Sequence, residues 1–165
     1  MRRAVFSILV GNSSGVLSRV AGMFSRRGYN IDSLTVGETL NPELSRMTIA
    51  VTGEDDVLEQ IEKQLNKLID VKEIVELPAH ESVCRERVMI KVECGPEKRQ
   101  QVSSIADIFR ANIVDVSKES MIIALTGSLS KMNAFVELLE DFNITEIART
   151  GITGLARGSA DLNKM

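Results

Sequence analysis

Along the first half of the chain, segments with the hydrophobic pattern of a β-strand alternate with segments that have the hydrophobic spacing of an α-helix. A continuous apolar run at residues 4–10 predicts a buried strand, and apolar positions at helical spacing after it predict a helix that begins at Ser13 or Ser14 and ends at Arg26–Arg27. Gly28 is the expected left-handed stop of that helix. The pattern then predicts strands at 31–36 and 46–51, a helix from Glu54 to Leu68 and a strand at 71–77. This element order is that of a ferredoxin-like fold.

The second half of the chain repeats the pattern after an interruption at residues 78–81. We expect a strand at 88–94, a helix that starts at Gly95-Pro96-Glu97, two strands at 112–116 and 121–126, a helix from about Ser130, and a last strand at 144–148. Gly28-Tyr29-Asn30-Ile31 in the first half corresponds to Arg110-Ala111-Asn112-Ile113 in the second. The sequence therefore predicts an α+β chain of two ferredoxin-like βαββαβ domains in tandem, over residues 1–78 and 79–165.

Composition and charge limit the partners that this chain can have. A hydrophobic fraction of 44% and a charged fraction of 26% are ordinary for a soluble globular protein. A net charge of −3 and only 4% aromatic residues argue against nucleic acid and anionic membranes as partners. The apolar runs fall short of a transmembrane helix. Arg2-Arg3 precede a short apolar run, but no small-residue cleavage site follows, so we expect a cytoplasmic protein.

Residues with catalytic or metal-binding chemistry are sparse. Cys84 and Cys94 lie too far apart along one predicted strand for a disulfide, so we expect reduced thiols. His80, the single histidine, lies in the interruption between the halves without a sequence neighbour that would make it a general base. The sequence contains neither a nucleophile–base arrangement nor a set of metal ligands at short spacing. We therefore expect a protein without catalytic or metal-binding residues.

The segment Gly11–Leu17, between the first strand and the first helix, is the strongest candidate for a ligand site. The first N–H groups of a helix lack internal partners and lie at the positive end of its dipole. Glycines let a ligand approach the backbone, and Asn12, Ser13 and Ser14 add short polar side chains. These features suit a small anionic group such as a carboxylate or a phosphate. The motif lacks the Lys-Ser/Thr of a Walker loop and the spacing of a dinucleotide fingerprint, so phosphate is disfavoured. A turn that only caps the helix is the alternative.

The corresponding junction in the second half has different chemistry. Pro96 removes a backbone donor there, and Glu97 adds a negative charge that would repel a carboxylate. We therefore assign the ligand to the first half alone.

Several segments of this chain resemble the small regulatory subunit of acetolactate synthase, also called acetohydroxyacid synthase. The Gly-Tyr-Asn-Ile and Arg-Thr-Gly motifs make the resemblance more specific than one to a generic ACT domain. It extends over nearly the whole chain and is weakest over Cys84–Glu119. The matching segments are Gly11–Leu17, Phe24–Val36, Leu44–Ile49, Leu58–Leu65 and Ala148–Gly158.

This resemblance implies a non-catalytic subunit of branched-chain amino acid biosynthesis. Its first domain would be an ACT domain that forms a homodimer and binds valine or another branched-chain amino acid. Its partner would be the catalytic large subunit, which carries thiamine diphosphate, magnesium and FAD and condenses pyruvate with pyruvate or 2-oxobutyrate to form precursors of valine and isoleucine. The small subunit would activate that enzyme and confer feedback inhibition by valine, without a cofactor of its own.

The resemblance also assigns effector-binding residues. The loop would supply Asn12, Ser13, Ser14, Gly15, Val16 and Leu17, and the neighbouring subunit would supply Asn30 and Ile31. Helix N–H groups near Gly15 suit the effector carboxylate, and the two asparagine carbonyls suit its ammonium group. Val16, Leu17 and Ile31 would line an apolar pocket, although each is equally compatible with an ordinary core position. A freestanding amino-acid-sensing module that controls another enzyme or a transcription factor is the alternative function.

Overall fold

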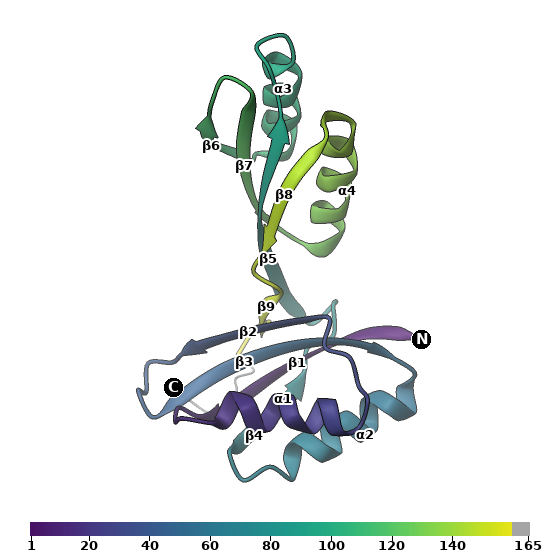
Figure 1. The fold of residues 1–165 in the computed structure, drawn as a ribbon. Coiled ribbons are helices and arrows are strands. Elements are labelled where there is room, and N and C mark those ends of the chain that lie inside the picture. Colours follow the sequence, from purple (N-terminus) through teal and green to yellow (C-terminus); the bar gives the residue numbers. More distant parts are fainter. Residues whose placement is uncertain (160–165) are drawn as a thin grey trace. The chain divides into compact units, whose positions relative to one another are not determined.

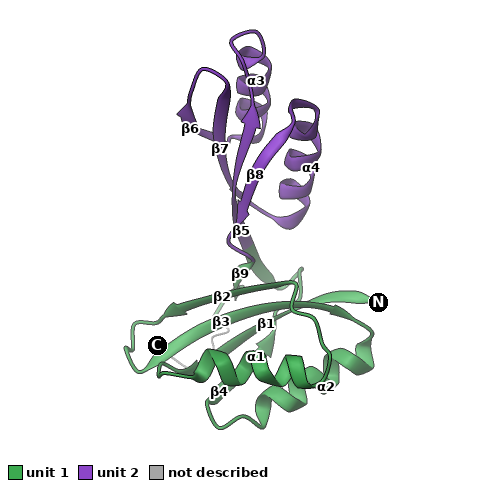
Figure 2. Ribbon diagram, in the orientation of Figure 1, with its two compact units in different colours: residues 1–84, 152–165 green, residues 85–151 purple. Residues whose placement is uncertain are grey.

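A computed structural model describes residues 1–159 of the chain and divides it into two compact units. Among the described residues, unit 1 comprises residues 1–84 together with residues 152–159, and unit 2 comprises Arg85–Gly151 (Figure 2). The last residues of the predicted second domain, 160–165, lie outside the described residues. The functional domains predicted over residues 1–78 and 79–165 remain a prediction.

Unit 1 is a four-stranded antiparallel sheet covered on one face by two helices (Figure 1). Its strands follow the spatial order β2-β3-β1-β4, and β1 and β3 pair along their whole length, from Arg2 opposite Gly53 to Gly11 opposite Leu44. The elements are β1 (Arg2–Gly11), α1 (Val16–Arg26), β2 (Ser33–Glu38), β3 (Leu44–Gly53), α2 (Asp55–Asn66) and β4 (Val71–Glu76).

Unit 2 repeats this topology with the spatial order β6-β7-β5-β8. The predicted α+β fold of two ferredoxin-like units in tandem is therefore confirmed. Its elements are β5 (Ser82–Glu93), α3 (Arg99–Phe109), β6 (Asn112–Val116), β7 (Ser120–Gly127), α4 (Leu129–Leu139), the 3₁₀ turn η1 (Glu140–Phe142) and β8 (Ile144–Arg149).

A short strand that the hydrophobic pattern did not predict, β9 (Thr153–Ala156), belongs to unit 1 and pairs with β5. Ile152, just before it, donates its N–H to Ser33 Oγ at 3.3 Å, and its carbonyl accepts from Thr35 Oγ1 at 3.3 Å. A Cβ on Gly154 would come within 2.9 Å of the Val83 carbonyl oxygen, so this close pairing requires glycine. The segment after unit 2 thus packs on the β2 side of the unit 1 sheet.

Each unit has its own hydrophobic core between its helices and one face of its sheet. Alternate residues of β1 and β3 supply the sheet side of the unit 1 core, because successive side chains of a strand point to opposite faces. The largest fully buried side chains of unit 1 are Phe6, Phe24, Ile8, Leu9, Met47, Ile49, Leu58, Ile61 and Leu65; those of unit 2 are Phe135, Ile90 and Met121.

Two predicted helix starts are wrong. Helix α1 begins at Val16 rather than at Ser13 or Ser14, because Gly15 before it adopts a left-handed conformation with φ 87°. Helix α3 begins at Arg99 rather than at residues 95–97, where a turn closes from Lys98 N–H to the Gly95 carbonyl at 3.0 Å. By contrast, the left-handed stop at Gly28 is confirmed, with φ 70°. Within residues 1–159, the helices are all too short or too polar to cross a lipid bilayer.

Candidate functional site

The loop between β1 and α1 lies exposed at the end of the unit 1 sheet and is tied down by Asn12. The N–H of Asn12 donates to the Glu43 carbonyl at 2.8 Å, and its Nδ2 donates to the Pro42 carbonyl at 2.9 Å and to Glu38 Oε2 at 3.3 Å. The side-chain amide therefore holds the loop against the connection between β2 and β3. None of residues 1–159 donates a hydrogen bond to Asn12 Oδ1, which leaves this oxygen as an acceptor.

The N-terminus of α1 presents unsatisfied backbone donors beside Gly15. Ser13 and Ser14 form a turn, closed by the Val16 N–H and the Ser13 carbonyl at 3.4 Å. Helix α1 has no side-chain cap. The N–H groups of Leu17 and Ser18 have no acceptor within residues 1–159, and both residues are exposed. These donors lie at the positive end of the helix dipole, where an anion is stabilised.

A guanidinium group adds a full positive charge to this junction. Arg19 donates from Nε to Asp70 Oδ2 at 2.6 Å and from Nη2 to Asp70 Oδ1 at 3.0 Å. Its third nitrogen, Nη1, lies 2.8 Å from the place that a Cβ on Gly15 would occupy. The hydrogen bond raises the pKa of Arg19 and lowers the pKa of Asp70, so both groups stay charged. Arg19 therefore places a fixed cation next to the loop.

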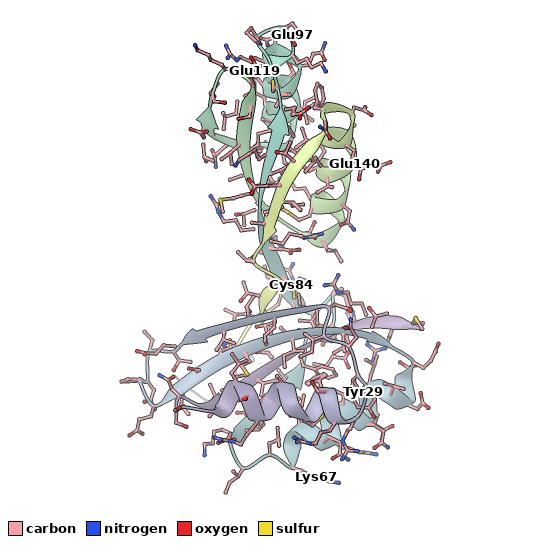
Figure 3. All side chains as sticks on the ribbon, viewed as in Figure 1. Tyr29, Lys67, Cys84, Glu97, Glu119 and Glu140 are labelled. Atoms are coloured by element: carbon pink, nitrogen blue, oxygen red, sulfur yellow. The ribbon has the colours of Figure 1, made fainter. Side chains whose placement is uncertain are left out.

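The equivalent junction in unit 2 carries the opposite charge. There, the carboxylate oxygens of Glu97 lie 2.7 and 2.8 Å from the position of a Cβ on Gly95. Glu97 stands just ahead of α3, and Figure 3 labels it at that end of unit 2. A negative side chain of the protein thus lies at the junction of unit 2, where the carboxylate of a ligand would meet repulsion.

The predicted apolar pocket residues lie in different environments. Val16 is buried in the unit 1 core, Ile31 packs partly buried against that core, and Leu17 is 46% exposed. Asn30 is exposed, and its Nδ2 lies 3.5 Å from Asp32 Oδ1. In one chain, therefore, Leu17 and Asn30 are available to a ligand, whereas Val16 supports the core.

Within a single chain, the loop and the pair Asn30–Ile31 lie far apart. The Asn12 N–H bonds to Glu43, ahead of β3, whereas the Asp32 N–H bonds to Ala50 near the other end of that strand. A strand rises roughly 3.3 Å per residue, so these points are about 20 Å apart. Helix α1 separates the two groups, and Figure 3 labels Tyr29 at the end of α1 opposite the loop. The fold brings Asn12–Leu17 together but does not bring Asn30–Ile31 to them.

Sequence reasoning missed two residues of this junction, Arg19 and Asp70. Arg19 lies one helical turn after Gly15, a spacing that places both on one side of α1. Asp70 comes from the turn before β4, 51 residues further along the chain, and no local pattern connects it to the loop. Among the described residues, no group of three or more His, Cys, Asp and Glu side chains could hold a metal ion.

Two family models together match most of this chain. Residues 85–158 match the model described as "Small subunit of acetolactate synthase", and residues 6–73 match the "AHAS small subunit-like ACT domain".

Individual proteins similar to this chain carry consistent names. The "Probable acetolactate synthase small subunit" of Archaeoglobus fulgidus is 51% identical over 153 residues, covering 93% of this chain and 96% of that protein. The "Acetolactate synthase isozyme 3 small subunit" of Salmonella typhimurium is 47% identical over 157 residues, covering 94% and 96%. The crystal structure of the acetolactate synthase small subunit from Thermotoga maritima superposes with a TM-score of 0.88 at 44% identity, covering 97% of this chain and all of that one.

Proposed function

The chain belongs to the acetolactate synthase small-subunit family, and we propose that it is a regulatory subunit whose N-terminal ACT domain binds valine or another branched-chain amino acid. In this proposal it activates a catalytic large subunit in the cytoplasm and makes that enzyme sensitive to feedback inhibition. The observation that carries the proposal is the β1–α1 junction, where helix N–H groups, the exposed Gly15 and the Arg19 guanidinium converge.

The chemistry of a free amino acid matches this junction. Its carboxylate suits the N–H groups of Leu17 and Ser18 beside the Arg19 guanidinium. Its ammonium group suits Asn12 Oδ1, to which none of the described residues donates. The exposed Leu17 side chain offers an apolar contact to a branched aliphatic group. The roles of Asn12, Ser13, Ser14, Gly15, Val16 and Leu17 as effector-loop residues follow from this proposal, with Val16 acting as a support from the core.

A complete effector site requires two copies of the chain in this proposal. Asn30 and Ile31 lie about 20 Å from the loop of their own chain, a distance that follows from strand geometry. A second copy is therefore needed to place them against a bound effector. Strand β2, which follows Asn30–Ile31, is an edge strand of the unit 1 sheet, and no strand within residues 1–159 pairs with its outer side. This supports a homodimer formed through the first domain.

The catalytic chemistry is assigned to the large subunit. Thiamine diphosphate, magnesium and FAD are expected there, and the condensation of pyruvate with a second 2-oxo acid would proceed on that partner. The present chain supplies effector binding and control of turnover.

Acetolactate assays with each subunit alone, and with both, test the proposal. We expect no product from this chain alone, faster turnover when it joins the large subunit, and inhibition of the pair by valine. Product from this chain alone would contradict the proposal. Unchanged turnover and valine sensitivity of the large subunit would favour a freestanding amino-acid sensor instead. Sedimentation at micromolar concentration should find a dimer, and a monomer with and without valine would contradict the two-chain site.

A further inference from the structure

A groove opens on the face of the unit 1 sheet that does not carry α1 and α2. Its volume is about 650 Å³, and its lining includes Thr35, Arg46 and Thr48 on the sheet and Leu155 on β9. Met47 and Ile49 of β3 face the helices, so the alternating residues Arg46 and Thr48 face the other way. The groove is separate from the β1–α1 junction and is not used by the proposed effector site.

Arg46 brings a positive charge into this groove without a carboxylate partner. Its Nη1 donates to Ser7 Oγ at 2.7 Å, a neutral acceptor on β1. Within residues 1–159, no carboxylate lies within 4.0 Å of its guanidinium, whereas Arg2, Arg19 and Arg149 each have such a partner. Burial lowers the pKa of Arg46, because the protein replaces part of the water around the charge. A charge that is partly removed from water in this way is stabilised by an external anion.

Two exposed leucines flank the charge on different walls of the groove. Leu40, from the connection between β2 and β3, is 89% exposed, and Leu155, from β9, is 59% exposed. Arginine surrounded by exposed apolar side chains is typical of protein–protein contact sites, where arginine is enriched and large apolar residues become buried. The combination fits a polypeptide that carries an acidic side chain next to an apolar one.

The wall of the groove is also in contact with the effector loop. Glu38 and Leu40 line the groove, and the same connection contains Pro42. The Asn12 side chain donates to Glu38 Oε2 and to the Pro42 carbonyl. An effector bound to Asn12 Oδ1 would therefore act on the same side-chain amide whose Nδ2 holds this wall. This geometry favours the catalytic partner as the occupant. If the effector is to change the activity of that enzyme, some part of this chain must contact both the effector loop and the enzyme, and the connection between β2 and β3 could do so.

We propose that this groove is the docking surface for the catalytic large subunit, which places a carboxylate on Arg46 and an apolar side chain between Leu40 and Leu155. The proposal rests on the proposed function and adds to it the surface and the chemistry of the partner.

Binding of the full-length chain to the purified large subunit, measured by calorimetry together with stimulation of acetolactate formation, tests the groove. We expect Arg46→Glu to weaken binding at least about tenfold, because a charge-assisted contact is replaced by repulsion. Leu40→Asp, at an exposed position that cannot disturb the core, should weaken it several-fold. Lys67→Glu, which reverses an exposed charge after α2, is the matched control and should bind normally. Valine binding to the isolated variants should match the wild type.

The outcomes separate this groove from the proposed function as a whole. If the wild-type chain neither binds nor stimulates the large subunit, the proposed function fails. If the wild type does both and Arg46→Glu and Leu40→Asp do so equally well, the groove proposal alone is overturned. It is also overturned if Arg46→Glu converts a wild-type dimer into a monomer, since the groove would then accept a second copy of this chain.

Discussion

The junctions β1–α1 and β5–α3 hold the same place in two copies of one topology, but they carry opposite charges. At Gly15 the neighbouring charged group is the Arg19 guanidinium, and at Gly95 it is the Glu97 carboxylate. The backbone closure at the far end of each helix is the same: Tyr29 N–H bonds to Phe24 O, and Ala111 N–H bonds to Ala106 O. The repeat has thus kept the backbone closure at the far end of the helix, whereas the two junctions differ both in charge and in backbone: Gly15, before α1, has φ 87°, and Lys98, before α3, has φ −105°.

A carboxylate placed at Gly15 should reduce the affinity for valine more than any other change proposed here. In Gly15→Asp the new side chain competes for the helix N–H groups and the Arg19 guanidinium, so the affinity for valine should fall at least about tenfold, as loss of a charge-assisted hydrogen bond implies. The variant Gly15→Ala shares the cost of a side chain at φ 87° but adds no charge, so the difference between the two isolates electrostatics. Calorimetric titration with valine measures both. Equal affinities in Asp and Ala variants would contradict the assignment.

Neutralising the charged side chain at each junction tests the comparison directly. Arg19→Gln should weaken valine binding several-fold, because a cation next to the effector carboxylate is lost. The matching change in unit 2, Glu97→Gln, should leave valine affinity at the wild-type value. Inhibition of the reconstituted enzyme by valine, measured as a midpoint concentration, provides the readout. A shift caused by Glu97→Gln and not by Arg19→Gln would place the effector in unit 2.

Alanine substitutions of Asn30 and Asn112, which hold corresponding positions in the two units, should differ less in their effect on valine inhibition. Asn30→Ala should remove one polar anchor worth about 1 kcal/mol, or roughly fivefold in affinity. Asn112 is the first residue of β6 and is exposed, so Asn112→Ala should leave valine inhibition unchanged. The same inhibition assay compares the two variants. Loss of valine sensitivity in Asn112→Ala alone would mean that the site lies in the other half of the chain.

The smallest expected effect is a difference in acid stability between two ion pairs, Arg19–Asp70 in unit 1 and Lys91–Glu146 in unit 2. Arg19 lowers the pKa of Asp70, and Lys91 lowers the pKa of Glu146, in both cases chiefly by a hydrogen bond. A lowered carboxyl pKa stabilises the fold above the ordinary value of about 4, and this stabilisation is lost as the pH falls through the lowered pKa. The Asp70 side chain is 13% exposed and that of Glu146 is 70% exposed, so solvent screens Glu146 more.

The melting temperature Tm, measured at pH 6 and again below pH 4, shows how much stability each ion pair loses in acid. Asp70→Asn should reduce the acid-induced fall in Tm more than Glu146→Gln does. An equal response in the two variants would show that burial of the carboxylate does not distinguish the two pairs.

The fold was predictable from the sequence because its periodic signals are local and strong. Strand β1 has an apolar run broken only by Ser7, and β3 carries Met47, Ile49 and Val51 at alternate positions. Helix α2 has an apolar stripe that begins after acidic residues at its N-terminus. Strand β9 gave no such signal, since its four residues include Gly154 and its partner β5 lies about 70 positions earlier.

The position of the candidate loop was also predictable, but its contacts were not. Ser13 and Ser14 have high preference for helix caps, yet the left-handed Gly15 moves the helix start beyond them. Hydrophobicity alone could not separate the buried Val16 from the exposed Leu17, because the direction of each side chain is fixed by tertiary packing. The Arg19–Asp70 pair joins residues 51 positions apart, and only the folded chain reveals it.

The return of the chain through Ile152 has a consequence for biosynthesis. Unit 1 is interrupted by the whole of unit 2, so a ribosome completes residues 85–151 before it makes β9. The bonds of Ile152 to Ser33 and Thr35 can therefore form only after all of unit 2 has been synthesised. Since domains generally fold in the order of their synthesis, unit 2 has the chance to fold while unit 1 is still unfinished. A nascent chain that stops at Gly151 would keep both sets of core residues but would lack the last strand of the first unit.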